Sequence, residues 1–167
     1  MGLPWKKLDE DCFDAVVIGE DTFACANKHQ RFYERMAARF PKEREGLKKY
    51  VTFLKEVGDH IFGVFKGDKH KRYTYSLLSR SAYEFLNETI KDPLLRKVLS
   101  GTSLKMELNA PTLPLYTFAQ INDSFIRSAW RLRGGGSQIA DKLVESICAM
   151  GGEVRTRAAV TYIKEEN

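Results

Sequence analysis

The stretch that decides the fold lies near the C-terminal end of this 167-residue chain and reads Ala129-Trp-Arg-Leu-Arg-Gly-Gly-Gly-Ser-Gln-Ile-Ala-Asp-Lys-Leu-Val-Glu-Ser-Ile-Cys-Ala-Met-Gly-Gly-Glu-Val-Arg-Thr-Arg-Ala-Ala-Val-Thr-Tyr-Ile163. A glycine loop precedes a helical pattern that Ser137 is expected to cap and that Gly151-Gly152 ends. The helix carries an apolar face formed by Ile139, Ala140, Leu143, Val144 and Ile147. This spacing of three and four predicts an amphipathic helix.

A strand is expected directly after that helix, over residues 153–163. Val154, Thr156 and Ala158 alternate with Arg155 and Arg157, and the alternation continues to Val160. Period-two alternation is typical of a half-buried strand. The order loop, helix, glycine turn and strand therefore organises the C-terminal part of the chain.

This order resembles the phytoene desaturase, carotenoid isomerase and retinol saturase branch of the flavin-dependent amine-oxidase-like oxidoreductases. The pattern of that branch falls here on Gly135, Gly136, Ile139 or Ala140, and Leu143. The resemblance implies that Gly135 and Gly136 let the backbone approach the flavin or substrate. It also places Val160 at the adenine end of FAD, where the backbone makes the contact.

Three other blocks carry the same resemblance, which spans about residues 11–163. The first block is Phe23-Ala-Cys-Ala-Asn-Lys-His-Gln-Arg-Phe-Tyr-Glu-Arg-Met36. Phe40-Pro-Lys-Glu-Arg-Glu-Gly-Leu-Lys-Lys-Tyr50 resembles a string characteristic of the branch, and Ser81-Ala-Tyr-Glu-Phe-Leu86 resembles a passage between two helices. The chain contains no Gly-x-Gly-x-x-Gly after a strand, the element that holds the FAD pyrophosphate. We therefore expect the Rossmann domain to be absent from this chain, and FAD to bind only in the complete protein.

The resemblance and the local signals together imply an α+β fold. We expect a small antiparallel or mixed sheet with a mostly helical cap, forming one substrate-domain region over residues 1–167. A hairpin is predicted from strands at 13–18 and 22–26, one of which should pair with strand 153–163. Helices are predicted over residues 28–39, 43–60, 81–90, 93–100 and 113–129. The basic run over residues 66–72 is interpreted as a solvated loop.

Aromatic residues beside irregular segments are the candidates for lining an apolar substrate pocket. They lack a packing role fixed by periodicity. The residues selected on this ground are Phe62, Phe65, Tyr116, Phe118 and Trp130.

Composition excludes several classes of protein. The apolar content of 43% is ordinary for a globular core, and the net charge of +5 is spread along the chain without a nucleic-acid motif. Three cysteines without Cys-x-x-Cys spacing suggest neither a disulfide framework nor zinc. No signal peptide or membrane-spanning run is expected, so the sequence favours a cytoplasmic protein, possible contact with a membrane surface aside.

Other polar groups leave alternatives open. The histidines, His29, His60 and His70, have no neighbour at metal or nucleophile spacing, which favours ordinary structural roles. The loop 134–136 fits either phosphate binding or close backbone approach to a flavin, and the second is favoured. Arg131 and Arg133 fit either a solvated strand edge or an anionic partner. No catalytic acid or base is named, because a flavin carries the hydride itself.

The favoured function is a substrate-binding region of a flavin-dependent oxidoreductase that acts on a long apolar or polyene substrate and is inactive alone. Its expected partners are that substrate and the remainder of the FAD domain. The alternative is a free-standing interaction module that keeps the cap fold without flavin. A third hypothesis, a module that binds membrane surfaces, depends on a basic and apolar stripe formed by Arg31, Phe32, Arg35, Met36, Arg39, Phe40 and Lys42.

Overall fold

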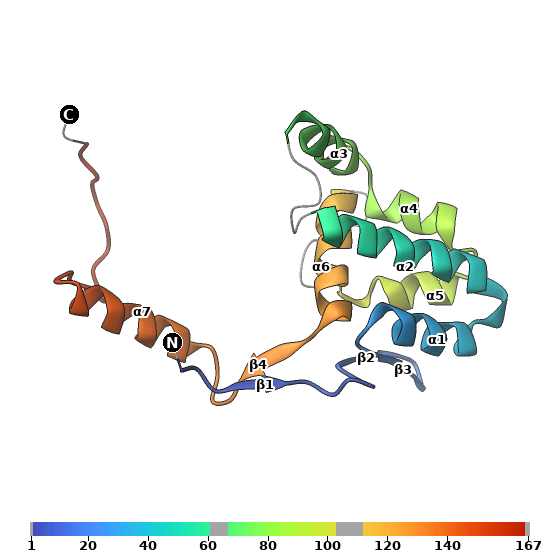
Figure 1. Ribbon diagram of the computed structural model, residues 1–167, viewed down its shortest axis with the longest axis horizontal. Coiled ribbons are helices and arrows are strands. Elements are labelled where there is room, and N and C mark those ends of the chain that lie inside the picture. Colours follow the sequence, from blue (N-terminus) through green and yellow to red (C-terminus); the bar gives the residue numbers. More distant parts are fainter. Residues whose placement is uncertain (1, 61–66, 103–111, 166–167) are drawn as a thin grey trace. The chain divides into compact units, whose positions relative to one another are not determined.

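The computed structural model describes residues 2–60, 67–102 and 112–165, without the side chains of Asp68 and His70. Figure 1 shows the elements in chain order. They are β1 (Trp5–Lys7), β2 (Asp14–Ile18), β3 (Asp21–Cys25), α1 (His29–Arg39), η1 (Pro41–Glu43), α2 (Arg44–Asp59), α3 (Asp68–Leu78), α4 (Ala82–Thr89), α5 (Pro93–Leu99), α6 (Leu115–Arg127), β4 (Trp130–Leu132) and α7 (Ser137–Ala149). The predicted α+β class is confirmed.

The chain divides into two compact units. The helical unit comprises the continuous residues 7–129, and the flanking unit comprises residues 1–6 and 130–167. The two ends of the helical unit are joined by a hydrogen bond of 2.9 Å from Leu8 N to Ala129 O. The helical unit is therefore an insertion between the two segments of the flanking unit. The expectation of one substrate-domain region over residues 1–167 stays a prediction.

The predicted hairpin is confirmed. Strands β2 and β3 pair antiparallel, with Val16 opposite Phe23 and Ile18 opposite Asp21. Gly19 supplies the positive φ of 62° in the connecting turn. Phe23 points into the core, where its ring stacks on Phe40 with a centroid distance of 5.7 Å. The hairpin is therefore held to the helices through one face.

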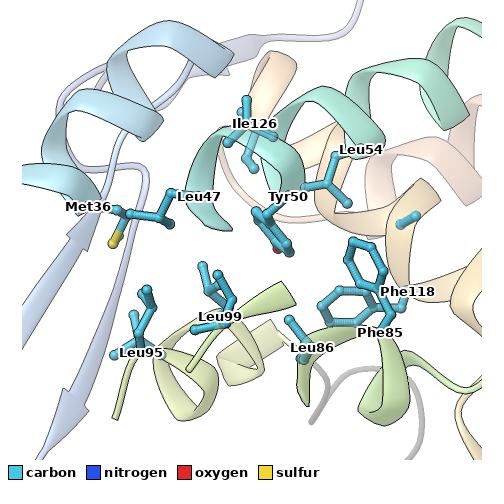
Figure 2. Packing of buried hydrophobic residues seen from close by; sticks show 14 of the residues in the cluster. Met36, Leu47, Tyr50, Leu54, Phe85, Leu86, Leu95, Leu99, Phe118 and Ile126 are labelled. Atoms are coloured by element: carbon cyan, nitrogen blue, oxygen red, sulfur yellow. The ribbon is translucent and has the colours of Figure 1, made fainter. Parts of the chain in front are cut away.

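Helices α1, α2, α4 and α6 enclose the core of the helical unit, and the rings around Tyr50 lie at its centre (Figure 2). The Tyr50 ring lies 6.4 Å from the ring centroids of Phe32, Phe85 and Phe118. Leu47 and Leu54 flank Tyr50 on the same face of α2 and are fully buried. The apolar spacing of α2 thus decides which face turns inward.

Two residues of segment 40–50, Glu43 and Gly46, contact the connection between α4 and α5. Glu43 is buried, and its carboxylate accepts hydrogen bonds from the backbone N–H groups of Asp92 (2.7 Å) and Lys91 (3.2 Å). A β-carbon at Gly46 would lie 2.4 Å from the carbonyl oxygen of Thr89. Glu43 and Gly46 therefore fix α2 against the connection between α4 and α5.

Two predicted helix starts are confirmed by their caps. The Ser81 hydroxyl accepts a hydrogen bond from Tyr83 N at the start of α4. The Asp92 carboxylate accepts from Leu94 N and Leu95 N at the start of α5. Both side chains satisfy amide groups that have no partner within the helix.

The structure corrects three predictions. The described part of the basic run, residues 67–72, lies mostly in helix α3 rather than in a loop. Tyr73 and Leu77, further along this helix, pack in or against the core and hold it there. Ser137 is the first residue of α7, and Gly136 occupies the cap position without a capping side chain. The described residues 152–165 contain no strand, although one was predicted over residues 153–163. The pairing of that segment with a hairpin strand stays a prediction. A strand needs a neighbouring strand for its backbone hydrogen bonds.

The apolar residues of the basic and apolar stripe face the core of the protein, while its basic residues are partly exposed. Its apolar members Phe32, Met36 and Phe40 are buried in the core. Arg35 and Arg39 form ion pairs with Asp11 and Asp21, respectively. These apolar side chains are therefore not available to a lipid surface, and membrane association by other parts of the chain stays a prediction.

Candidate functional site

The glycine loop and two tryptophans surround an open concavity in the flanking unit. Strand β4 leads into the loop and α7 leaves it, while Trp5 comes from β1, which pairs with β4. The concavity has a volume of about 600 Å³. Its lining consists of Trp5, Trp130, Arg131, Leu132, Arg133, Gly134, Gly135, Gly136 and Ile139.

The loop has a conformation that favours glycine. Gly134 and Gly135 have φ angles of 86° and 99°, a region that side chains with a β-carbon rarely adopt. The Gln138 amide donates hydrogen bonds to the carbonyl oxygens of Arg133 (2.6 Å) and Gly135 (3.0 Å), which closes the loop onto the first turn of α7. A β-carbon at Gly135 or Gly136 would have no neighbour within 4 Å. The loop therefore presents bare backbone to whatever approaches it.

The chemistry of this concavity suits a flat, partly apolar molecule. The side chains of Trp5 and Trp130 are large and about half exposed, at 54% and 53%. Indole rings offer apolar contact area together with a polar N–H edge. Arg131 and Arg133 add guanidinium groups that pair with anionic oxygens.

The structure brings together three of the residues selected from the sequence. Gly135, Gly136 and Trp130 line this one concavity. Trp5 also lines it and was missed, because the short strand β1 has no sequence pattern that predicts it.

The other selected residues lie elsewhere. Tyr116 and Phe118 belong to α6 of the helical unit, where Phe118 is fully buried and Tyr116 is half-buried against the core. Phe62 and Phe65 lie outside the described residues. The pocket-lining role of all four stays a prediction.

Val160 lies in the irregular segment that follows α7. Its side chain is 78% exposed, as are the side chains of Tyr162 and Ile163 around it, at 78% and 84%. The segment presents these apolar side chains at its surface.

Helix α7 also has an uncovered apolar face. Every residue of this helix is at least partly exposed, and the exposed apolar stripe comprises Ile139, Leu143, Val144 and Ile147. The helix ends in a Schellman motif, in which Gly152 N donates to Ile147 O (2.9 Å) and Gly151 N to Cys148 O (3.0 Å). The end of α7 is thus well formed although its face is not packed.

In the described part of the chain, no group of three His, Cys, Asp or Glu side chains is placed to hold a metal ion. None of the helices described is both long and apolar enough to cross a bilayer.

Comparison with known proteins gives one informative likeness. The chain is 29% identical over 184 residues to all-trans-retinol 13,14-reductase of Danio rerio, and the match covers 96% of this chain. It covers 30% of the reductase, so the chain spans about a third of the length of this relative. No protein-family model and no solved structure matches the chain. The likeness supports a retinol-saturase-like relationship.

Proposed function

We propose that this chain is the substrate-binding region of a flavin-dependent oxidoreductase of the retinol saturase or phytoene dehydrogenase kind. The complete protein would act on a long apolar or polyene substrate, a retinoid or carotenoid, by hydride transfer to or from FAD. The observation that carries the proposal is the likeness to a retinol reductase along 96% of the chain. The chain by itself is expected to be inactive.

The division of the chain supports this proposal. A continuous helical unit over residues 7–129 interrupts a second unit made of residues 1–6 and 130–167. A substrate domain inserted between two parts of a cofactor domain has this connectivity. The helical unit would then be the cap over the substrate, and the flanking unit would belong to the FAD domain.

The flanking unit has the surface of an incomplete domain. An amphipathic helix of 13 residues normally buries its apolar stripe, yet the stripe of α7 is exposed. Val160, Tyr162 and Ile163 extend the exposed apolar surface beyond the helix. The remainder of the FAD domain is the partner that would cover both.

The glycine loop fits a role beside the flavin. Gly135 and Gly136 leave free space where a β-carbon would stand, so a ring system can approach the backbone closely. Trp130 would contact the substrate or the ring edge, and Val160 would meet the adenine end through its backbone. The flavin supplies the hydride chemistry when bound, and these residues supply binding and orientation.

A chimera tests the proposal. The matching segment of the Danio rerio reductase is replaced by this chain, and the purified product is assayed for flavin absorbance and for reduction of all-trans-retinol. We expect flavin to be retained by the chimera and by Val160→Ala, and to be lost from Val160→Pro, which removes a backbone N–H. The isolated chain, which lacks the pyrophosphate-binding element, should purify without flavin.

Thr161→Pro in the same chimera is the matched control for general damage to the segment. Thermal unfolding of each variant shows whether the protein is still folded. Flavin bound to the isolated chain, or normal flavin occupancy in Val160→Pro, would overturn the assignment of residue 160 and of the FAD domain.

A further inference from the structure

A buried carboxylate holds a histidine at the edge of a groove in the helical unit. His29 Nε2 lies 2.6 Å from Oδ1 of Asp123, which is 94 residues further along the chain. Asp123 is 1% exposed, whereas the His29 side chain is 18% exposed. A carboxylate is an acceptor, so Nε2 carries the proton of this hydrogen bond. The ring is therefore oriented with its Nε2 edge inward.

Asp123 does not depend on His29 alone to balance its charge. Its Oδ2 accepts a hydrogen bond of 2.5 Å from Arg127 Nε, and Arg127 Nη2 donates to Asp59 Oδ1 at 2.7 Å. Burial lowers the pKa of Arg127, but its hydrogen bonds to Asp123 and Asp59 outweigh that effect and raise it overall. Arg127 is a permanent cation beside Asp123, so the charge of Asp123 is balanced without His29.

The local backbone is arranged around this contact at a cost. A β-carbon at Gly58 would lie 1.8 Å from Asp123 Oδ2, so α2 can pass the carboxylate only with glycine there. Lys28, directly before His29, has a φ of 70° and donates its N–H to Ile126 O at 2.6 Å. Such backbone outliers persist where the surrounding structure over-determines them, and they are frequent at functional sites.

The groove that His29 lines is polar and carries positive charge. It lies between α1 and α2 and has a volume of about 590 Å³, within the range of small-molecule sites. Its lining consists of His29, Gln30, Tyr33, Lys48, Val51, Thr52 and Lys55, a set without an acidic side chain. Lys48 and Lys55 are exposed and form no ion pair with the described residues.

We propose that His29, Lys48 and Lys55 form a binding site for a small organic oxyanion, a molecule bearing a carboxylate or phosphate group. The two ammonium groups supply charge, and Tyr33 and Thr52 supply hydroxyl donors. The His29 ring lines the same groove while its Nε2 stays on Asp123. The site belongs to the helical unit, and the inference does not rest on the flavin proposal.

The test follows the ring nitrogens of His29 by NMR in the full chain labelled with ¹⁵N. Sodium phosphate and sodium acetate are added at constant pH, and sodium chloride at equal ionic strength is the reference. We expect a saturable shift with phosphate or acetate that chloride does not reproduce. Lys48→Gln and Lys55→Gln should each weaken binding about tenfold, as loss of one charge-assisted hydrogen bond predicts.

Lys49→Gln is the matched control, because Lys49 adjoins Lys48 and is exposed but does not line the groove. The affinity of Lys49→Gln for phosphate and acetate should equal that of the unchanged chain. Vesicles of phosphatidylcholine with phosphatidic acid form a further arm, and a shift of His29 with these vesicles alone identifies a lipid headgroup as the source of the oxyanion. The proposal is overturned if no arm shifts His29 beyond chloride, or if Lys49→Gln weakens binding as much as the groove variants.

Discussion

The Asp123 carboxylate fills the space that a side chain at Gly58 would need, because a β-carbon at position 58 would lie 1.8 Å from Oδ2 of Asp123. The glycine lies in the last turn of α2 and the aspartate lies in α6. These two helices form the most extensive contact between helices in the described part of the helical unit. The pair therefore decides how closely the two helices approach beside His29.

Gly58→Ala is expected to lower the free energy of unfolding by about 3 kcal/mol. The methyl group displaces Asp123 and breaks its contacts with His29 and Arg127, which leaves buried charge uncompensated. Urea unfolding monitored by circular dichroism measures the loss. In an Asp123→Ala background the same substitution should cost nothing and gain up to about 1 kcal/mol from helix propensity. An equal loss in both backgrounds would contradict the steric explanation.

Glu43→Ala is expected to destabilise the helical unit by about 2–3 kcal/mol, because it leaves the N–H groups of Lys91 and Asp92 without their acceptor. Glu43→Gln keeps one amide oxygen and should cost about half as much. Thermal or urea unfolding measures both values. Glu45→Ala, an exposed neighbour in the first turn of α2, is the control and should cost less than about 1 kcal/mol. Equal losses for Glu43→Ala and Glu45→Ala would show that the hydrogen bonds of Glu43 do not stabilise the helical unit.

Tyr50 should make the fold sensitive to alkaline pH. Burial is the main cause that raises the pKa of its hydroxyl in the folded state, above the ordinary value of about 10. The stability linked to this proton is complete below about pH 10 and falls as pH rises further, because the unfolded chain ionises first. When the pH rises from about 9 to about 11, the free energy of unfolding of Tyr50→Phe should fall by about 1 kcal/mol less than that of the unchanged chain.

Urea unfolding at several pH values measures that difference. Phe118→Leu serves as the control, because it removes a ring contact of Tyr50 and keeps the hydroxyl. Its alkaline loss should match that of the unchanged chain. Identical pH profiles for Tyr50→Phe and the unchanged chain would show that the hydroxyl does not carry the effect.

Helix α7 should exchange its amide protons much faster than α2 in the isolated chain. Its apolar stripe is exposed, and a helix of this length without packing is marginally stable in water. Hydrogen exchange followed by mass spectrometry compares residues 137–149 with residues 47–54. Leu143→Glu should leave the free energy of unfolding of the helical unit unchanged. Leu54→Ala should lower that free energy by about 2–5 kcal/mol. Protection in α7 equal to that in α2 would show that the stripe is covered.

Local patterns in the sequence predicted most of the helical unit. Spacing of apolar residues located α1, α2 and α6, and the caps Ser81 and Asp92 located the starts of α4 and α5. Helices and turns are predictable in this way because their signals lie within a few residues of each other. The glycines of loop 134–136 and the termination of α7 at Gly151 were identified on the same ground.

Contacts between distant residues were decided by the tertiary structure alone. Helix α3 was missed because its first residues are mostly basic and its apolar residues follow only from Tyr73 onward. The tertiary structure alone shows that Tyr73 and Leu77 pack in or against the core. Residues 153–163 have the alternation of a strand, but alternation cannot supply a neighbouring strand. His29 and Asp123 lie 94 residues apart, so no spacing in the sequence reveals that they meet. The sequence by itself determined the local elements, and packing determined which side chains form a site, because burial and charge pairing depend on neighbours that the chain order does not specify.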